Sequence, residues 1–352
     1  MSSAFAQLVD RPAGTGPRFH ANGRALRAGD WVEVRSAEEI LGTLDERGEL
    51  EQLPFMPEML QFCGRRLRVY KSAHKTCDTI ERYTGRRMLN AVHLEGARCD
   101  GAAHGGCQAG CLLFWKEAWL KRVPGPLPEG SVAPVLDSAH SRGLENTIRA
   151  TQLSVQITNG NGGERYRCQA TELLRATTPL AWWDPRHYVR DLLSGNVRLG
   201  ALLRYVIIAA FNSLMRLHWR GRPYPYLQGL ARGETPSDKL DLQPGELVQV
   251  RTKREIMRTL NDDLKNRGLK FDVEMVPYCG KTYRVLRKVE KIINEKNGQM
   301  TRLPNACLIL EGVTCSGCLS TNRLFCPRSV YPYWHEIWLR RVSGRDAQVL
   351  TQ

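Results

Sequence analysis

The segment Gly29-Asp30-Trp31-Val32-Glu33-Val34-Arg35 has a counterpart further along the chain, Gly245-Glu246-Leu247-Val248-Gln249-Val250-Arg251, at an offset of 245 − 29 = 216. In both segments a glycine precedes apolar residues that alternate with polar ones. This alternation is typical of a strand with one buried face. The sequence therefore predicts the same first strand twice, each at the start of a similar unit.

The similarity continues far beyond these strands. The offset of 216 holds up to the cysteines near residue 99, and an insertion of three residues then changes it to 219. One register kept over residues 29–123 indicates an internal duplication. The aligned pairs include Cys63 with Cys279, Cys99 with Cys315, Cys107 with Cys326, Trp115 with Trp334, and Trp119 with Trp338.

Most local patterns within each unit are those of strands. Short helices are expected only at 36–44 and 252–260, where Ser or Thr precedes Glu by three residues, as in a capping box. Several short strands in one small unit favour a small barrel, and the G-D/E-x-V-x-V opening is similar to the first strand of SH3-like barrels. We therefore expect an α+β chain with two homologous SH3-like, cysteine-rich domains joined by a helical connector.

These patterns divide the chain into five parts. The expected parts are a flexible N-terminal segment (1–28), repeat 1 (29–124), a connector (125–244), repeat 2 (245–343) and a tail (344–352). Within the connector, helices are predicted at about 185–193 and 197–217. The second is the most apolar stretch of the chain, and it fits either a buried connector helix or a membrane-surface helix flanked by arginines. Arg204 interrupts its apolar run, which is then too short to span a bilayer.

Charge and cysteine content restrict the partners and the compartment. The chain of 352 residues has 51 Lys and Arg against 36 Asp and Glu, a net charge of +15. This balance favours an anionic substrate, and a partner enzyme or peripheral membrane contact through 197–222 is also compatible with it. The segment from Met1 to Gly29 lacks the apolar core of a secretory signal, so eleven cysteines predict a cytoplasmic, reducing location, with membrane association on the inner face as an alternative.

The cysteines kept in register predict metal binding. Four thiolates from separate loops can form a closed zinc site or hold an iron–sulfur cluster. Zn²⁺ is expected ahead of a [4Fe-4S] cluster, although Cys326-Pro327 favours the cluster. Cys168 and Cys307 are expected in the core. The predicted metal ligands are Cys63, Cys99, Cys107 and Cys111 in repeat 1, and Cys279, Cys315, Cys318 and Cys326 in repeat 2.

Residues kept by only one unit are the candidates for chemistry. Cys77 lies in Lys75-Thr76-Cys77-Asp78, beside a cation that favours the thiolate, and repeat 2 has Ile293 in its place. His104 lies in a glycine-rich loop three residues before Cys107. Cys77 and His104 are therefore the predicted catalytic residues, in a pocket beside the first metal site and lined by the connector helix. The shared carboxylates, Glu95 with Glu311 and Glu58 with Glu274, predict a role in the fold, for instance in ion pairs with Arg68 and Arg284.

Four strings resemble a family of bacterial tandem cysteine-rich proteins found near polysaccharide and specialised-metabolite genes. They are FMPEMLQFCGRRLRVYKSAHKTCDTI (55–80), HLEGARCDGAAHGGCQAGCLLFWKEAWLKRV (93–123), WWDPRHYVRDLLSGNV (182–197) and FCPRSVYPYWHEIWLRRV (325–342). The resemblance covers residues 29–342 and implies a biosynthetic context without an activity to transfer.

Two classes of function follow from these patterns. The favoured one is a metal-binding cytoplasmic protein, zinc or iron–sulfur, that acts as an enzyme or an accessory component in a bacterial biosynthetic pathway. The alternative is a zinc-stabilised basic module that binds nucleic acid or another polyanion. The absence of RNP and helix-turn-helix patterns makes nucleic acid the less favoured ligand.

Overall fold

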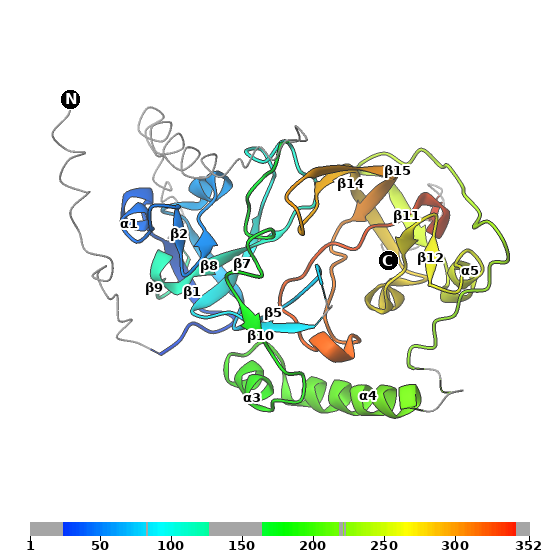
Figure 1. The fold of residues 1–352 in the computed structure, drawn as a ribbon, viewed down its shortest axis with the longest axis horizontal. Helices are drawn as coiled ribbons and strands as arrows, with labels where there is room; N and C mark the ends of the chain where they lie inside the picture. Colours follow the sequence, from blue (N-terminus) through cyan, green and yellow to red (C-terminus); the bar gives the residue numbers. More distant parts are fainter. Residues whose placement is uncertain (1–23, 82–83, 127–163, 218–220, 222, 343–352) are drawn as a thin grey trace.

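The computed structural model describes residues 24–81, 84–126, 164–217, 221 and 223–342. The predicted N-terminal segment up to residue 23, part of the connector and the tail from residue 343 lie outside the described residues. Figure 1 shows two curled sheets at opposite ends of the molecule, with two helices of the connector along its lower edge. The chain is α+β with mostly strands, as predicted.

The first sheet has the strand order β8-β7-β4-β1-β9. All neighbours are antiparallel, and β1 lies between β4 and β9. The first half contains β1 (Trp31–Val34), α1 (Ala37–Leu41), β2 (Glu49–Leu50), β3 (Leu53–Pro54), the 3₁₀ helix η1 (Pro57–Phe62), β4 (Arg66–Ser72), β5 (Lys75–Cys77), β6 (Gly85–Arg87), β7 (Ala91–Arg98), β8 (Leu112–Lys116), η2 (Glu117–Trp119) and β9 (Leu120–Val123).

The second sheet has the order β15-β14-β11-β16. The second half contains β11 (Leu247–Val250), α5 (Lys253–Met257), β12 (Lys265–Asn266), β13 (Leu269–Lys270), η3 (Val273–Tyr278), β14 (Thr282–Ile293), β15 (Met300–Leu310), η4 (Thr321–Arg323), η5 (Glu336–Trp338) and β16 (Leu339–Arg341).

Strand registers in the two sheets follow the sequence offset. Val32 pairs with Leu67 in the first sheet, and their counterparts Val248 and Tyr283 pair with each other in the second. At the other edge, Val34 pairs with Leu120 as Val250 pairs with Leu339. Both short helices carry the expected capping boxes, on Ser36–Glu39 and Thr252–Glu255. The aligned residues therefore occupy the same strand positions in both halves.

Each sheet curls around an aromatic core. In the first half Phe55 meets Trp119 edge-on with 5.3 Å between ring centroids, and in the second Phe271 meets Trp338 at 5.2 Å. Each of these tryptophans is fully buried, and its indole N–H donates to a threonine hydroxyl at 3.0 Å, on Thr43 or Thr259. This acceptor replaces the hydrogen bond to water that a buried indole N–H loses. The indole N–H groups of the neighbouring Trp115 and Trp334 are buried without such a partner among the described residues.

The connector supplies β10 (Thr178–Pro179), α3 (Arg186–Leu193) and α4 (Leu199–Leu217). β10 pairs with β6 of the first half, and α4 packs against η4 of the second. The predicted helices are thus present, but the interpretation of 197–217 as a buried helix is wrong. Only 6% of the apolar segment of α4 is buried, because the molecule covers just one side of the helix.

In each half, the end of one strand contacts the cysteine loop of the other half. The backbone N–H groups of Glu290 and Lys291, near the end of β14, donate to the side-chain oxygen of Gln108 at 2.6 and 3.1 Å. In the other direction, Cys77 at the end of β5 forms a hydrogen bond with the Cys326 thiol. Ile293 is the counterpart of Cys77 in the duplication, so equivalent strand ends reach the cysteine loop of the opposite half.

We expect Thr43→Val and Thr259→Val each to lower the free energy of unfolding by about 1–3 kcal/mol, because each leaves a buried indole N–H without an acceptor. Urea unfolding of the two variants measures this loss. Thr43→Ser and Thr259→Ser keep the hydroxyl and serve as controls. Valine variants as stable as the serine variants would show that these hydrogen bonds do not stabilise the cores.

Candidate functional site

A glycine-dependent loop follows β7 in the first half and β15 in the second. Gly101 has φ +74°, and a Cβ there would lie 2.8 Å from the backbone nitrogen of Cys107. The equivalent Gly317 has φ +67°, and its Cβ would lie 2.6 Å from the backbone nitrogen of Cys326. Only glycine allows this approach, so each loop is closed onto its own cysteine.

Each loop is also held by a buried carboxylate. Glu58 on η1 accepts hydrogen bonds from the His104 ring at 2.6 Å and from the backbone N–H of Ala103 at 3.1 Å. Glu274 on η3 accepts from the backbone N–H of Leu319 at 2.7 Å and from the Ser316 hydroxyl at 2.7 Å. The predicted fold role of these glutamates therefore consists in holding the loops.

Of the two carboxylates expected to pair with Arg68, Glu95 forms the ion pair and Glu58 does not. Arg68 lies near Glu95, with 3.9 Å between Nη1 and Oε1, on the exposed side of the sheet. Glu58 points to the opposite side, where it is 5% exposed and where His104 takes the place expected for the arginine. The two groups lie on different elements, Glu58 on η1 and Arg68 on β4.

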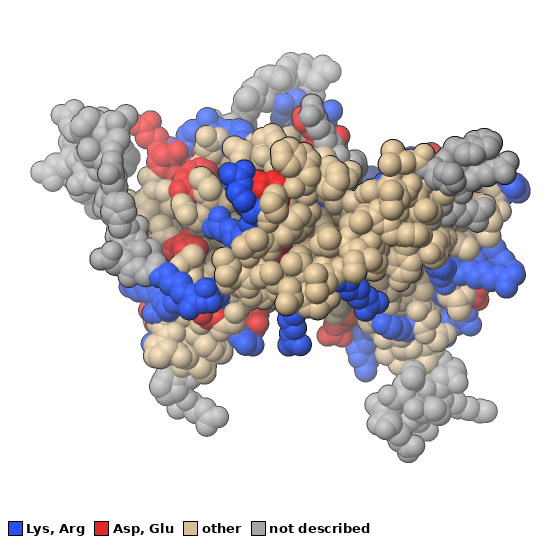
Figure 2. All heavy atoms as spheres, turned by 90° about the horizontal axis from the view of Figure 1, so that it is seen from below, with Lys and Arg blue, Asp and Glu red and all other residues tan. Residues whose placement is uncertain are grey.

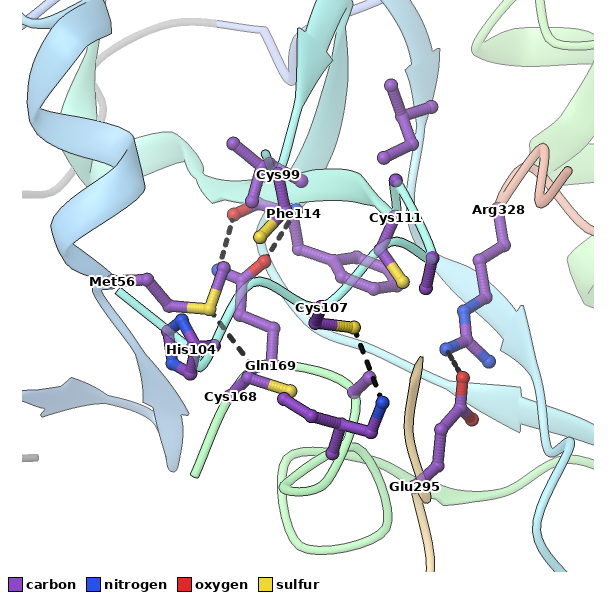
Figure 3. A pocket seen from close by; sticks show the side chains of 16 residues that line it. Met56, Cys99, His104, Cys107, Cys111, Phe114, Cys168, Gln169, Glu295 and Arg328 are labelled. Carbon is purple, nitrogen blue, oxygen red and sulfur yellow. Dashed lines mark hydrogen bonds and ion pairs between the residues drawn. The ribbon is translucent and has the colours of Figure 1, made fainter. Parts of the chain in front are cut away.

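Four cysteines line one cavity of about 40 Å³ in the first half. Figure 3 shows Cys99, Cys107, Cys111 and Cys168 around it, with Arg328 and Glu295 of the second half at one side. The cavity is otherwise lined mainly by apolar side chains, including Met56, Leu113, Phe114 and Ile293. Three of the four predicted ligands of repeat 1 therefore meet, together with a cysteine of the connector.

The fourth predicted ligand, Cys63, is not at this cavity. It belongs to the hydrophobic core of the first half, at the end of η1, and is 4% exposed. Cys168, expected to be a core residue, occupies the ligand position instead. The sequence predicts a connector that is separate from repeat 1, and no spacing rule relates Cys168 to residues 99–111.

Burial raises the pKa of three of the cavity thiols, those of Cys99, Cys111 and Cys168. It raises the pKa of Cys111 to about 11 and the pKa of Cys168 to about 12, and it raises the pKa of Cys99 further still. The nearby Arg328 opposes the shift at Cys111 by stabilising the thiolate. A bound metal ion would release the protons of these thiols and replace them as the counter-charge.

A second cysteine group lies between the halves. Cys77 and Cys326 lie close together, and the Cys326 thiol together with the positive charge of Arg328 and Arg323 lowers the pKa of Cys77. The same contact raises the pKa of Cys326. Cys315 lies close enough to both to interact electrostatically. Cys77, one of the two predicted catalytic residues, is only 3% exposed and lies against a cysteine of the other half.

The remaining predicted ligands of repeat 2 lie in different places. Cys318 lies on the Glu274-bound loop, where its backbone N–H donates to Glu274 at 3.2 Å, and it interacts electrostatically with Lys75. Cys279 packs against the hydrophobic core of the second half. It thus has the same position as Cys63, to which it corresponds in the sequence.

One compact group of potential ligands occurs in the part of the chain that the structure describes. Ligand atoms of Glu58, Cys99 and His104 all lie within 4.8 Å of one another. Both ring nitrogens of His104 face oxygen atoms, Glu58 Oε1 at 2.6 Å and the carbonyl of Arg167 at 3.0 Å. His104, a predicted catalytic residue, is 4% exposed, so its ring is enclosed by the loop and its neighbours in this structure.

A buried polar network on α3 escaped the sequence analysis. Lys75 Nζ lies 2.5 Å from Asp191 Oδ2, and Asp191 is fully buried. Burial lowers the pKa of Lys75, and the Asp191 carboxylate opposes this shift. The ammonium group also lies 4.9 Å from the ring centre of Tyr188 and 3.3 Å from His187 Nδ1. The one sequence feature that indicates this network is Lys75, which lies two residues before Cys77 on the short strand β5.

The connector helix does not line the first cysteine cavity. The described residues around that cavity come from the first half, from residues 168–170 and from the strand end and loop of the second half. α4 instead contacts the second half, where Tyr205 meets Phe325 edge-on with 6.1 Å between ring centroids. The predicted arrangement of pocket and helix is therefore wrong.

His93 produces a pH dependence of stability. Burial lowers its pKa to about 3, although its Nδ1 donates to the carbonyl of Leu113 at 2.9 Å. An unfolded histidine has a pKa near 6.5, so below about pH 6.5 the unfolded chain binds a proton that the folded chain does not. The free energy of unfolding therefore falls as the pH drops from about 6.5 towards 3.

We expect His93→Asn, which keeps a donor for Leu113 and does not titrate, to weaken this dependence. Between about pH 7 and pH 4.5 the wild type should lose about 2–3 kcal/mol more than the variant, measured by urea unfolding. Parallel stability curves for the two proteins would contradict a neutral, buried His93.

No protein-family model matches this chain, and the searches of curated proteins and of solved structures gave no match.

Proposed function

We propose that the protein holds an iron–sulfur cluster in the cavity lined by Cys99, Cys107, Cys111 and Cys168. The observation that carries this proposal is that four cysteines, three from the loop between β7 and β8 and one from the connector, line one mainly apolar cavity. Four cysteine thiolates are the usual ligands of a [4Fe-4S] cluster, and an apolar surrounding keeps solvent away from it.

The spacing of the sulfur atoms favours a cluster over a single zinc ion. A tetrahedral zinc site with Zn–S bonds of about 2.3 Å needs its four sulfur atoms close together. Among the described residues, the one group of ligand atoms within 4.8 Å of one another contains a single cysteine. In a cluster each thiolate binds a different iron atom, so the sulfur atoms stand further apart.

Zinc at Glu58, Cys99 and His104 is the second candidate. It is supported by Glu58, a member of this compact group, whose Oε2 is buried without a hydrogen-bond partner among the described residues. Against it stand the two hydrogen bonds of the His104 ring, one of which a metal ion would have to replace.

Cys77, Cys315, Cys318 and Cys326 form the corresponding set for a second centre. Cys77 and Cys326 are in contact, and Arg323 and Arg328 supply positive charge beside them. The residue order Cys315-Ser-Gly-Cys318 and the sequence Cys326-Pro327 resemble runs that bind clusters. In this proposal each half supplies a cysteine loop, and the fourth ligand comes from outside it.

The two halves are, in this proposal, copies of one SH3-like unit. The equal offsets of their strand registers, capped helices and buried tryptophans support a common origin. Together with the sequence resemblance, the centre suits a cytoplasmic enzyme or accessory component of a bacterial biosynthetic pathway. The basic charge suits an anionic substrate.

Anaerobically purified protein should contain iron and acid-labile sulfide in equal amounts, about four of each per centre. It should be brown, with broad visible absorption that dithionite bleaches. Elemental analysis of the same sample measures zinc. Colourless protein with one zinc per chain, lost in Glu58→Gln, would replace the cluster with the second candidate. Protein without metal would contradict both.

Cys168→Ser should remove the iron of the first centre, about half of the total if both centres are filled, because only three thiolates remain. Cys63→Ser is the matched control, since Cys63 is equally buried and was predicted as a ligand from the sequence alone. It should keep its iron. Loss of iron in Cys63→Ser with retention in Cys168→Ser would refute this ligand set.

A further inference from the structure

The outward face of α4 is apolar, the reverse of a normal surface helix. Exposed fractions are 56% for Leu203, 68% for Ile207 and 62% for Leu214. These residues recur at spacings of four and seven, so they form one stripe along the helix. The stripe comprises Leu199, Leu203, Val206, Ile207, Ala210, Leu214 and Leu217.

The opposite face of α4 is fixed to the rest of the molecule. Asn212 is buried, and its side-chain amide exchanges two hydrogen bonds with the backbone of Tyr224, at 2.7 and 2.9 Å. On the same face Tyr205 contacts Phe325. α4 has the length and composition of a membrane-spanning helix, but this packing holds it flat on the protein. The apolar stripe is therefore presented to the surroundings along its whole length.

The apolar surface continues onto α3 and the segment before it. Trp182 is 52% exposed and Trp183 is 71% exposed, and on α3 Val189 and Leu193 are also exposed. Adjacent exposed tryptophans are unusual on a water-facing surface, whereas tryptophan is enriched where an apolar phase meets water. Figure 2, which views the molecule from the side on which α3 and α4 lie, shows a broad surface without charge, with Lys and Arg mainly around it.

The charged groups of this surface are almost all cationic. Between residues 182 and 217 the only acidic residues are Asp184 and Asp191. Asp184 is paired with Arg186 at 2.8 Å, and the fully buried Asp191 is paired with Lys75. Arg204 and Arg216 project from α4 on opposite sides of the apolar stripe, as its helical positions require. The exposed arginines of the segment are Arg186, Arg190, Arg198, Arg204 and Arg216.

We propose that the surface formed by Trp182, Trp183, α3 and α4 docks on an anionic lipid bilayer, with both helices lying in the interface. Apolar side chains would enter the boundary between headgroups and acyl chains, while the flanking arginines bind lipid phosphates. A second copy of the chain is a poorer occupant, because a twofold contact would bring these arginine rims against each other. The proposal is independent of the metal centre.

Co-sedimentation of the full chain with vesicles tests this docking. Phosphatidylcholine–phosphatidylglycerol vesicles should bind the protein, and pure phosphatidylcholine vesicles should bind it several-fold less. High salt should weaken the difference, since it screens the arginines. The double variant Leu203→Glu/Ile207→Glu should bind about tenfold more weakly or worse, because two exposed apolar side chains no longer enter the lipid.

Leu286→Glu is the matched control, since Leu286 is 39% exposed on β14, away from this surface. It should bind vesicles like the wild type, and the control, the double variant and the wild type should share one unfolding curve. Arg204→Gln/Arg216→Gln should reduce binding to anionic vesicles only. Absence of vesicle binding would overturn the proposal. So would a dimer, seen by light scattering, that the double variant dissociates, or protein that alkaline carbonate cannot release from vesicles.

Discussion

A buried glutamate in each half holds together the segments on which the cysteine positions depend. Glu58 connects η1, which precedes β4, with the loop that follows β7. Glu274 connects η3, which precedes β14, with the loop that follows β15. Removing a carboxylate from water is costly unless several donors replace the lost hydration. The loops supply these donors, and a glycine lets each loop close tightly enough to do so. The fold and the site are therefore built by the same contact.

Because a strand end of each half contacts the cysteine loop of the other half, the two cysteine groups depend on each other. The backbone N–H of Ile293 lies 3.4 Å from the Cys107 sulfur, while Cys77 reaches Cys326. Between them, buried Arg328 donates to Thr79 at 2.8 Å and to Glu295 at 2.6 Å. It also lines the first cavity. One guanidinium thus lies beside both groups, so neither site is complete within a single half.

The sequence predicts much of the local structure because that structure depends on periodicity and capping. The constant offset between the repeats predicts the equivalent strands, and the capping residues Ser36 and Thr252 predict where the short helices begin. The ligand set depends instead on which distant segments meet. Cys63 aligned well with Cys279, but both positions face cores, whereas Cys168 has no aligned partner and reaches the cavity. Equivalence between repeats identifies shared positions, and in this chain those include core positions as well as loop positions.

The outward stripe of α4 explains a second limit of prediction. An apolar helix in a sequence is normally interpreted as buried, because burial stabilises apolar side chains. Here one face is buried by the second half and the other is not covered by any described residue. α3 connects this surface to the interior through Asp191, which meets Lys75 two residues before Cys77. A bilayer on α3 and α4 would therefore lie against the same element that orients the second cysteine group. Several contacts fix this geometry, among them the buried Lys75–Asp191 pair and the hydrogen bonds between Asn196 and the backbone of Ser72.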